Sequence, residues 1–296
     1  MPSNAADTMI ASFREWQLGP EVPARTWEEL RAMSAQMAAA QPAPEGVDTS
    51  RVELAGVPVD HTRVPGVDTA CHVVYVHGGG YVCGSASGQQ AFVAELARAA
   101  SADVWAVEYR LAPEHRCPAA IDDVIAATVA VQSGAGDVPV VVGGDSAGGG
   151  LAVAAVLEMR ARALELPRGL FALSPWTDMT LTNRCFDDLA TRDVMVRKSD
   201  LAMMRDCYLG DADPAAPHAS PGLADLTGLP PVLVQVGGEE VLLGDAQLLV
   251  DRATRDGVQA ELEVADGMFH TWQVIAPGLP ESQHAISSLA RFLARL

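Results

Sequence analysis

Basic residues are scarce in this sequence. Lys198 is the only lysine among 296 residues, and Lys and Arg together number 20 against 38 Asp and Glu, which gives a formal net charge of -18. Nucleic acids and anionic membrane surfaces are both bound through clustered Lys and Arg side chains. The composition therefore argues against both as partners, and it indicates an acidic, self-repelling surface.

Paired cysteines and long apolar runs are also absent. The five cysteines are Cys71, Cys83, Cys117, Cys185 and Cys207. Because their number is odd and no C-x-x-C pair occurs, we expect free thiols in a reduced compartment rather than a zinc site or a redox dithiol. Nothing beside Cys83 would lower the pKa of its thiol, so we do not expect it to act as a nucleophile. No apolar run reaches the length of a signal peptide or a membrane span, which predicts a cytoplasmic protein with no membrane span.

Short apolar stretches alternate with helical ones from residue 71 onward. Strands are predicted at 72–76, 104–108, 138–142, 170–174, 232–236 and 260–264, and helices at 89–100, 119–132, 147–163, 244–256 and 281–296. Two β-rich stretches at 51–54 and 57–64 precede them and suggest an antiparallel pair. This alternation predicts an α/β fold with a mostly parallel sheet and right-handed crossovers.

Two segments fall outside the alternation. Residues 8–40 have a helical pattern with a break at Pro20 and Pro23, and residues 41–44 have the composition of a linker. Residues 176–228 interrupt the strand–helix rhythm with acidic, Met-rich helical pieces. Functional loops are often inserted between sheet elements, so we expect this stretch to be a lid.

The run Gly144-Asp145-Ser146-Ala147-Gly148 fits the pattern G-x-S-x-G, which places a serine nucleophile on a sharp strand-to-helix turn. A predicted strand ends just before it and a predicted helix follows, as that turn requires. A glycine-rich turn of this kind can also bind phosphate. The segment lacks both the Lys of a Walker loop and regular G-x-G-x-x-G spacing, so we favour Ser146 as a nucleophile.

A second glycine-rich segment, His77-Gly78-Gly79-Gly80, directly follows the strand predicted at 72–76. Consecutive glycines let backbone N–H groups approach a substrate oxygen without obstruction by side chains. The alternative is a flexible turn in which His77 is structural. Together with Ser146, the segment favours a loop that binds an oxyanion.

A serine nucleophile needs a base and a carboxylate that orients the base. His270 follows the strand predicted at 260–264 and comes after Ser146, as G-x-S-x-G enzymes require, whereas His77 and His115 precede the serine. Glu239 and Glu240 follow the strand predicted at 232–236. Either glutamate satisfies the order Ser…Glu…His, and the pair has the alternative of being an exposed acidic turn.

Taken together, these segments resemble the bacterial hormone-sensitive-lipase family of esterases. The matching segments, in family order, are His77-Gly78-Gly79-Gly80, 109–115, 144–149, Ser174-Pro175-Trp176 with Asp178, 239–243 and the loop around His270. The resemblance implies an α/β-hydrolase fold with an eight-stranded sheet flanked by helices and a helical cap. By its register, residues 1–45 and 176–228 form the cap, and residues 46–175 and 229–296 form the two parts of the core.

The resemblance also implies the roles of the site residues. The oxyanion hole would consist of the N–H groups of Gly79, Gly80 and Ala147. The triad acid would be Glu240, at a position where the family usually has Asp, with Glu239 and Asp245 as nearby rivals.

The implied activity is that of a serine carboxylesterase, acting through an acyl-enzyme on small, uncharged esters with short- to medium-chain acyl groups, lactones included. It requires no metal and no cofactor, and a homodimer follows by analogy. Two alternatives share the fold. A non-catalytic receptor for a small ligand would be expected to lack the base that His270 provides. An amidase or peptidase would use the same triad and is not separated from an esterase by sequence.

Overall fold

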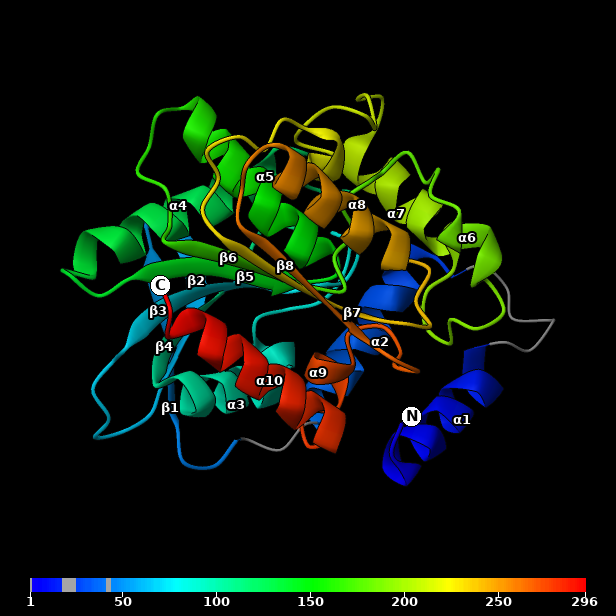
Figure 1. The fold of residues 1–296 in the computed structure, drawn as a ribbon, viewed down its shortest axis with the longest axis horizontal. Helices are drawn as coiled ribbons and strands as arrows, with labels where there is room; N and C mark the ends of the chain where they lie inside the picture. Colours follow the sequence, from blue (N-terminus) through cyan, green and yellow to red (C-terminus); the bar gives the residue numbers. More distant parts are fainter. Residues whose placement is uncertain (1, 18–24, 41–43) are drawn as a thin grey trace.

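The protein is built on one eight-stranded sheet. The computed structural model describes residues 2–17, 25–40 and 44–296 (Figure 1). The strands are β1 (Asp48–Leu54), β2 (Val57–Arg63), β3 (Cys71–Val76), β4 (Ala102–Val107), β5 (Val140–Asp145), β6 (Gly169–Leu173), β7 (Val232–Gly237) and β8 (Ala260–Ala265). They lie in the order β1-β2-β4-β3-β5-β6-β7-β8. β2 pairs antiparallel with β1 and β4, and every other pairing is parallel. The predicted α/β fold and mostly parallel eight-stranded sheet are therefore confirmed.

Helices cover both faces of the sheet (Figure 1). One layer contains α3 (Gln90–Ala100), α9 (Trp272–Ile275) and α10 (Pro280–Leu293), and the other contains α4 (Ala119–Gly134), α5 (Ala147–Ala161) and α8 (Leu243–Arg255). In β3, Val74 and Val76 belong to the core cluster shared with α4 and α5, whereas Val73 and Tyr75 belong to the cluster shared with α3 and α10. Side chains alternate across a strand, so a sheet covered on both faces needs an unbroken apolar run.

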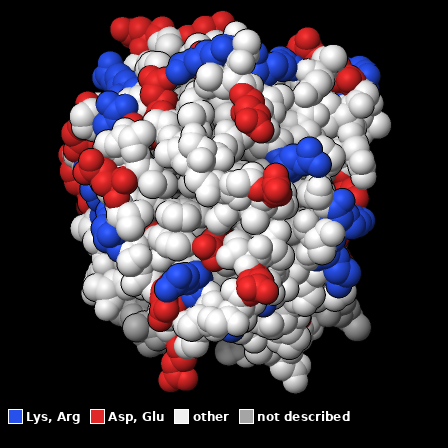
Figure 2. All heavy atoms as spheres, turned by 90° about the vertical axis from the view of Figure 1, so that its left-hand side faces the viewer, with Lys and Arg blue, Asp and Glu red and all other residues white. Residues whose placement is uncertain are grey.

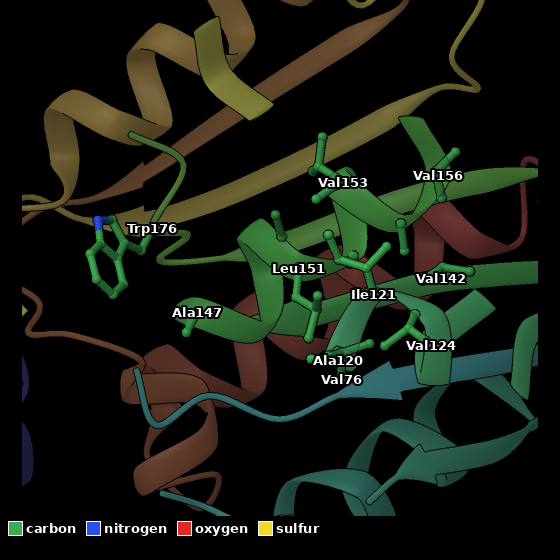
Figure 3. Packing of buried hydrophobic residues seen from close by; sticks show 14 of the residues in the cluster. Val76, Ala120, Ile121, Val124, Val142, Ala147, Leu151, Val153, Val156 and Trp176 are labelled. Carbon is green, nitrogen blue, oxygen red and sulfur yellow. The ribbon is translucent and has the colours of Figure 1, made fainter. Parts of the chain in front are cut away.

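The layer that contains α5 is tightly packed around the carboxyl end of β5 (Figure 3). Leu151 and Val153 of α5 are buried, and Ile121 of α4 lies in the same cluster as Val76 and Val142 from the sheet. Trp176, which follows β6, is fully buried near the first turn of α5. This packing holds the start of α5, and therefore residue 146, in a fixed position.

Among the described residues, four helices lie outside the two layers. α1 (Asn4–Gln17) and α2 (Trp27–Ala40) precede the sheet, and α6 (Cys185–Asp188) and α7 (Lys198–Leu209) lie between β6 and β7. Short 3-10 turns occur at Ser87–Gln89 and Pro221–Leu223. The break predicted at Pro20 and Pro23, and most of the linker predicted at 41–44, lie outside the described residues.

Acidic and basic side chains are interspersed on the face shown in Figure 2, with wide neutral areas between them. Elsewhere among the described residues, acidic and basic side chains form ion pairs, as Arg162 does with Asp122 and Glu158. In the part of the chain that the structure describes, no helix is long and apolar enough to cross a membrane.

Candidate active site

Ser146 stands at the turn between β5 and α5, with φ of 55° and ψ of -122°. A positive φ is strained for any residue with a Cβ, so tertiary contacts must hold the turn. The Ser146 N–H donates to the carbonyl oxygen of Leu173 at 2.8 Å, and the Ser146 carbonyl accepts from Trp176 N–H at 3.0 Å. These bonds attach the turn to β6 and to the segment that follows it.

The glycines of the G-x-S-x-G run are required by close packing against the end of β3. A methyl group added at Gly144 would lie 2.2 Å from the carbonyl oxygen of Val76, and one added at Gly148 would lie 2.1 Å from the same atom. Carbon and oxygen atoms that are not bonded cannot approach so closely. The spacing of the two glycines therefore reflects a place where backbone meets backbone.

This packing gives a stability prediction. Gly148→Ala is expected to lower the free energy of unfolding by about 2–3 kcal/mol or more, because β3 or α5 must move to admit the methyl group. Gly134→Ala is a matched control, since a methyl group there would meet nothing within 4 Å. It should leave the protein as stable as before or raise stability by up to about 1 kcal/mol. Urea denaturation measures both, and a Gly148→Ala protein as stable as the wild type would contradict the close approach.

His270 connects the serine to a carboxylate. It lies between β8 and α9, and its Nε2 is 2.9 Å from Ser146 Oγ. Its Nδ1 is 2.7 Å from Glu240 Oε2. A carboxylate can only accept, so Nδ1 carries the proton and Nε2 is free to accept the hydroxyl proton of Ser146.

Glu240 is fully buried after β7 and is held by donors on its other oxygen. Its Oε1 accepts from the Gly237 N–H and from the Ser174 hydroxyl, both at 2.6 Å. Ser174 Oγ in turn accepts from the Thr271 N–H at 3.1 Å, next to His270. Ser174 thus joins the turn that carries Glu240 to the loop that carries His270. Sequence reasoning gave Ser174 no role, although it belongs to the Ser-Pro-Trp segment of the resemblance.

The two rival carboxylates bind other groups. Glu239 forms an ion pair with Arg192. Asp245 is buried and accepts from the backbone N–H groups of Thr177 and Asp178 at 2.8 and 2.9 Å. Of the three carboxylates considered, Glu240 is the one that the structure brings to His270.

The environment of His270 favours its charged form. Burial lowers the pKa of His270, but the charge and hydrogen bond of Glu240 act in the opposite direction, with smaller contributions from the buried Asp193 and Asp145. The net effect raises the pKa of His270 above its ordinary value. The imidazolium form of His270 is therefore stabilised.

The glycine loop follows β3. Gly79 and Gly80 have φ of 113° and 60°, values that favour glycine. Within the described residues, neither of their N–H groups donates to a protein acceptor. Ala147 begins α5, so its N–H is one of the first donors that a helix cannot satisfy internally. Gly148 packs against the carbonyl oxygens of Val76 and His77, which places the start of the loop beside the first turn of α5.

His77 and Cys83 support this loop. The His77 ring stacks on Tyr109 with centroids 4.2 Å apart, and its Nδ1 donates to the Gly78 carbonyl at 2.7 Å. Burial lowers the pKa of His77 to about 4, so the ring is neutral. Burial raises the pKa of the Cys83 thiol to about 11, and its Sγ donates to the Gly79 carbonyl at 3.2 Å. Cys83 is therefore a thiol at neutral pH.

A serine hydroxyl bonded to an imidazole, which a buried carboxylate orients, is the arrangement of a nucleophilic hydrolase. The chain matches the family described as alpha/beta hydrolase fold over residues 73–274. The fold and the geometry around Ser146 therefore place the protein in the class of α/β hydrolases.

Individual relatives narrow the class. An acetyl-hydrolase of Streptomyces hygroscopicus is 40% identical over 75% of this chain and 74% of the relative. An esterase of Acinetobacter venetianus is 31% identical over 90% of this chain and 88% of its own. The crystal structure of an esterase from the bacterial hormone-sensitive lipase family is 41% identical, with a TM-score of 0.93 over 100% of this chain and 99% of that one. The chain belongs to that family of α/β-hydrolase esterases, as its sequence predicted, and is a carboxylic ester hydrolase.

Proposed function

We propose that the protein is a serine carboxylesterase that cleaves small, uncharged esters with short- to medium-chain acyl groups, using Ser146, His270 and Glu240 as its triad. The observation that carries the proposal is the continuous hydrogen-bond chain from Ser146 Oγ through His270 to Glu240, at 2.9 and 2.7 Å. The acyl preference is supported by the relative named acetyl-hydrolase and by a solved relative, 35% identical, that was soaked with p-nitrophenyl butyrate.

Acylation proceeds by attack of Ser146 Oγ on the ester carbonyl carbon while its proton moves to His270 Nε2. The carbonyl oxygen becomes an alkoxide, and Glu240 stabilises the imidazolium. The C–O bond to the alcohol then breaks as His270 gives its proton to the leaving oxygen. The acyl group remains on Ser146 as an ester.

Deacylation repeats these steps with water. His270 takes a proton from the water as its oxygen attacks the acyl carbon, and returns the proton to Ser146 Oγ as the carboxylic acid leaves. The proposed oxyanion hole is the N–H groups of Gly79, Gly80 and Ala147. Removing one such donor typically costs about 3 kcal/mol of transition-state stabilisation.

The proposed cap comprises residues 1–45 and 176–228. Its support is that both segments contact the loops of the site. Arg31 of α2 donates to the carbonyl oxygens of Val82 and Ala112, each at 3.0 Å. Met204 of α7 lies against Gly80, where its Sδ is 2.0 Å from the position of an added methyl group.

Hydrolysis of p-nitrophenyl esters of graded chain length tests this function. We expect the highest kcat/KM between acetyl and octanoyl esters, and a steep fall for longer chains. γ-Butyrolactone and p-nitroacetanilide give two further arms. Lactone opening fits the proposal because a lactone is a cyclic ester, whereas faster cleavage of the anilide than of the esters would indicate an amidase. No turnover of any ester would overturn the proposal.

The pH dependence of the reaction provides a separate prediction. The base must be neutral to accept the proton of Ser146, so kcat/KM should fall as the pH drops through the raised pKa of His270. The midpoint of this acid limb should lie above about 6.5, the ordinary imidazole value. Removing the charge of Glu240 leaves burial as the dominant influence, so Glu240→Gln should move the limb to lower pH. A wild-type limb below the ordinary value would contradict this electrostatic account.

A further inference from the structure

Asp145 is a buried carboxylate directly beside the serine. It ends β5, is 4% exposed, and bonds to β3 and the glycine loop. Its Oδ1 accepts from the Tyr75 hydroxyl at 2.6 Å and from the Gly78 N–H at 2.9 Å. Its Oδ2 lies 2.3 Å from the position of a methyl group added at Gly78, so the carboxylate rests against that glycine.

The strand-to-helix turn does not itself require a carboxylate at this position. The G-x-S-x-G pattern leaves it open, and burying a carboxylate is costly unless the charge is compensated. Burial raises the pKa of Asp145, opposed by the bonds from Tyr75 and Gly78 and by the charge of His270. Burial raises the pKa of Tyr109, and the nearby charge of Asp145 raises it further. A cost of this kind points to a role that the turn alone does not explain.

That role concerns the place where the glycine loop begins. Tyr109 hydroxyl donates to the His77 carbonyl at 2.9 Å, and His77 Nδ1 donates to the Gly78 carbonyl. The first bond holds the loop to the segment after β4, and the second lies within the loop. The bond from Gly78 N–H to Asp145 instead ties the loop to the residue covalently joined to Ser146. The position of the loop is thereby linked to that of the nucleophile.

We propose that Asp145 is a positioning residue for the oxyanion loop: by holding the Gly78 peptide, it sets the N–H groups of Gly79 and Gly80 relative to Ser146 Oγ. This inference rests on the proposed triad and oxyanion hole. Stabilisation of an oxyanion depends on donors placed in advance, and losing one lowers kcat by about 10²–10³-fold. The competing explanation is that the carboxylate only satisfies a buried N–H, in which case its removal would lower stability without changing the rate of the folded enzyme.

Asp145→Ala and Asp145→Asn separate the two explanations. Asp145→Ala removes the acceptor, so kcat for p-nitrophenyl acetate should fall by about 100-fold with little change in KM. Asp145→Asn retains an acceptor oxygen, so its kcat for the same ester should fall by only about tenfold. Because Asp145 also raises the pKa of His270, along with Glu240 and Asp193, the Asn variant should shift the acid limb of kcat/KM to lower pH. Inhibition by a trifluoromethyl ketone, whose adduct carries an oxyanion, should weaken in parallel with kcat/KM.

Asp60→Asn is the matched control, because Asp60 is 5% exposed on β2, three strands from β5 in the sheet, and pairs with Arg51. It should lower the melting temperature while leaving kcat within about twofold of the wild-type value.

An Asp145→Ala protein that is folded, by circular dichroism, and has a kcat within threefold of the wild-type value would overturn the inference. If that variant does not fold, Asp145→Asn decides: wild-type kcat together with undiminished inhibition by the trifluoromethyl ketone would overturn it. An inactive wild type would overturn the proposed function and this inference with it, whereas an active wild type with unaffected variants overturns the role of Asp145 alone.

Discussion

Replacing Ser146 with alanine should reduce kcat for p-nitrophenyl acetate by at least about 10⁴-fold. The hydroxyl is the group that His270 Nε2 faces at 2.9 Å, and without it no acyl-enzyme forms. The residual rate would come from water activated by His270 beside an intact oxyanion loop. Initial rates at saturating ester, corrected for uncatalysed hydrolysis, give the comparison.

The same variant should remain folded. Alanine occupies the strained turn as serine does, and the Ser146 contacts to Leu173 and Trp176 are backbone bonds that survive the change. The free energy of unfolding should therefore shift by less than about 1 kcal/mol. A Ser146→Ala protein that is folded and retains more than a few per cent of wild-type kcat would show that another group is the nucleophile.

The second large effect concerns the carboxylate. Glu240→Gln should lower kcat by about 10³–10⁴-fold. Both donors on Glu240 Oε1, Gly237 N–H and the Ser174 hydroxyl, require an oxygen there. The glutamine NH₂ group would then face His270 Nδ1 and favour the tautomer protonated on Nε2. That tautomer cannot accept the proton of Ser146.

Glu239→Gln is the control for this substitution because it changes the neighbouring residue in the same way. Glu239 pairs with Arg192, whose side chain is 54% exposed, and an exposed ion pair contributes at most about 1 kcal/mol to stability. The kcat of Glu239→Gln should stay within a few-fold of the wild-type value. Equal activity of the two variants, or a larger loss for Glu239→Gln, would show that Glu240 is not the triad acid.

The architecture could be predicted because each parallel strand has a simple physical signature. β3 is apolar on both faces because helices cover both, and that run is visible without any structure. Strand ends were harder. The strand predicted at 138–142 is β5, Val140–Asp145. Gly143 and Gly144 have the composition of a turn, yet they continue the strand because they pair with β3 and β6. Glycine is needed at both positions because Phe171 and Val76 pack too closely for side chains. Such packing is a tertiary property.

The candidate site shows the same division. Ser146, His270 and the glycine loop carry local patterns and a required chain order, so the sequence could name them. The choice between Glu239 and Glu240 depended on family register, because adjacent residues in a turn point in different directions that composition does not reveal. Asp193 lies in no recognisable pattern, and the Ser-Pro-Trp segment marks Ser174 without showing what its side chain binds. Ser174 binds Glu240 across 66 residues of sequence, and Asp193 accepts from the Val241 N–H across 48.

Covalent labelling identifies the nucleophile. Diethyl p-nitrophenyl phosphate reacts with an activated serine to release p-nitrophenol and leave a phosphoryl group on the nucleophile. If Ser146 is the nucleophile, we expect one equivalent of p-nitrophenol per chain, with the added mass on the peptide that contains Ser146, and no burst from Ser146→Ala. A modified residue elsewhere, such as Cys83, or no adduct on a protein that turns over esters, would contradict it.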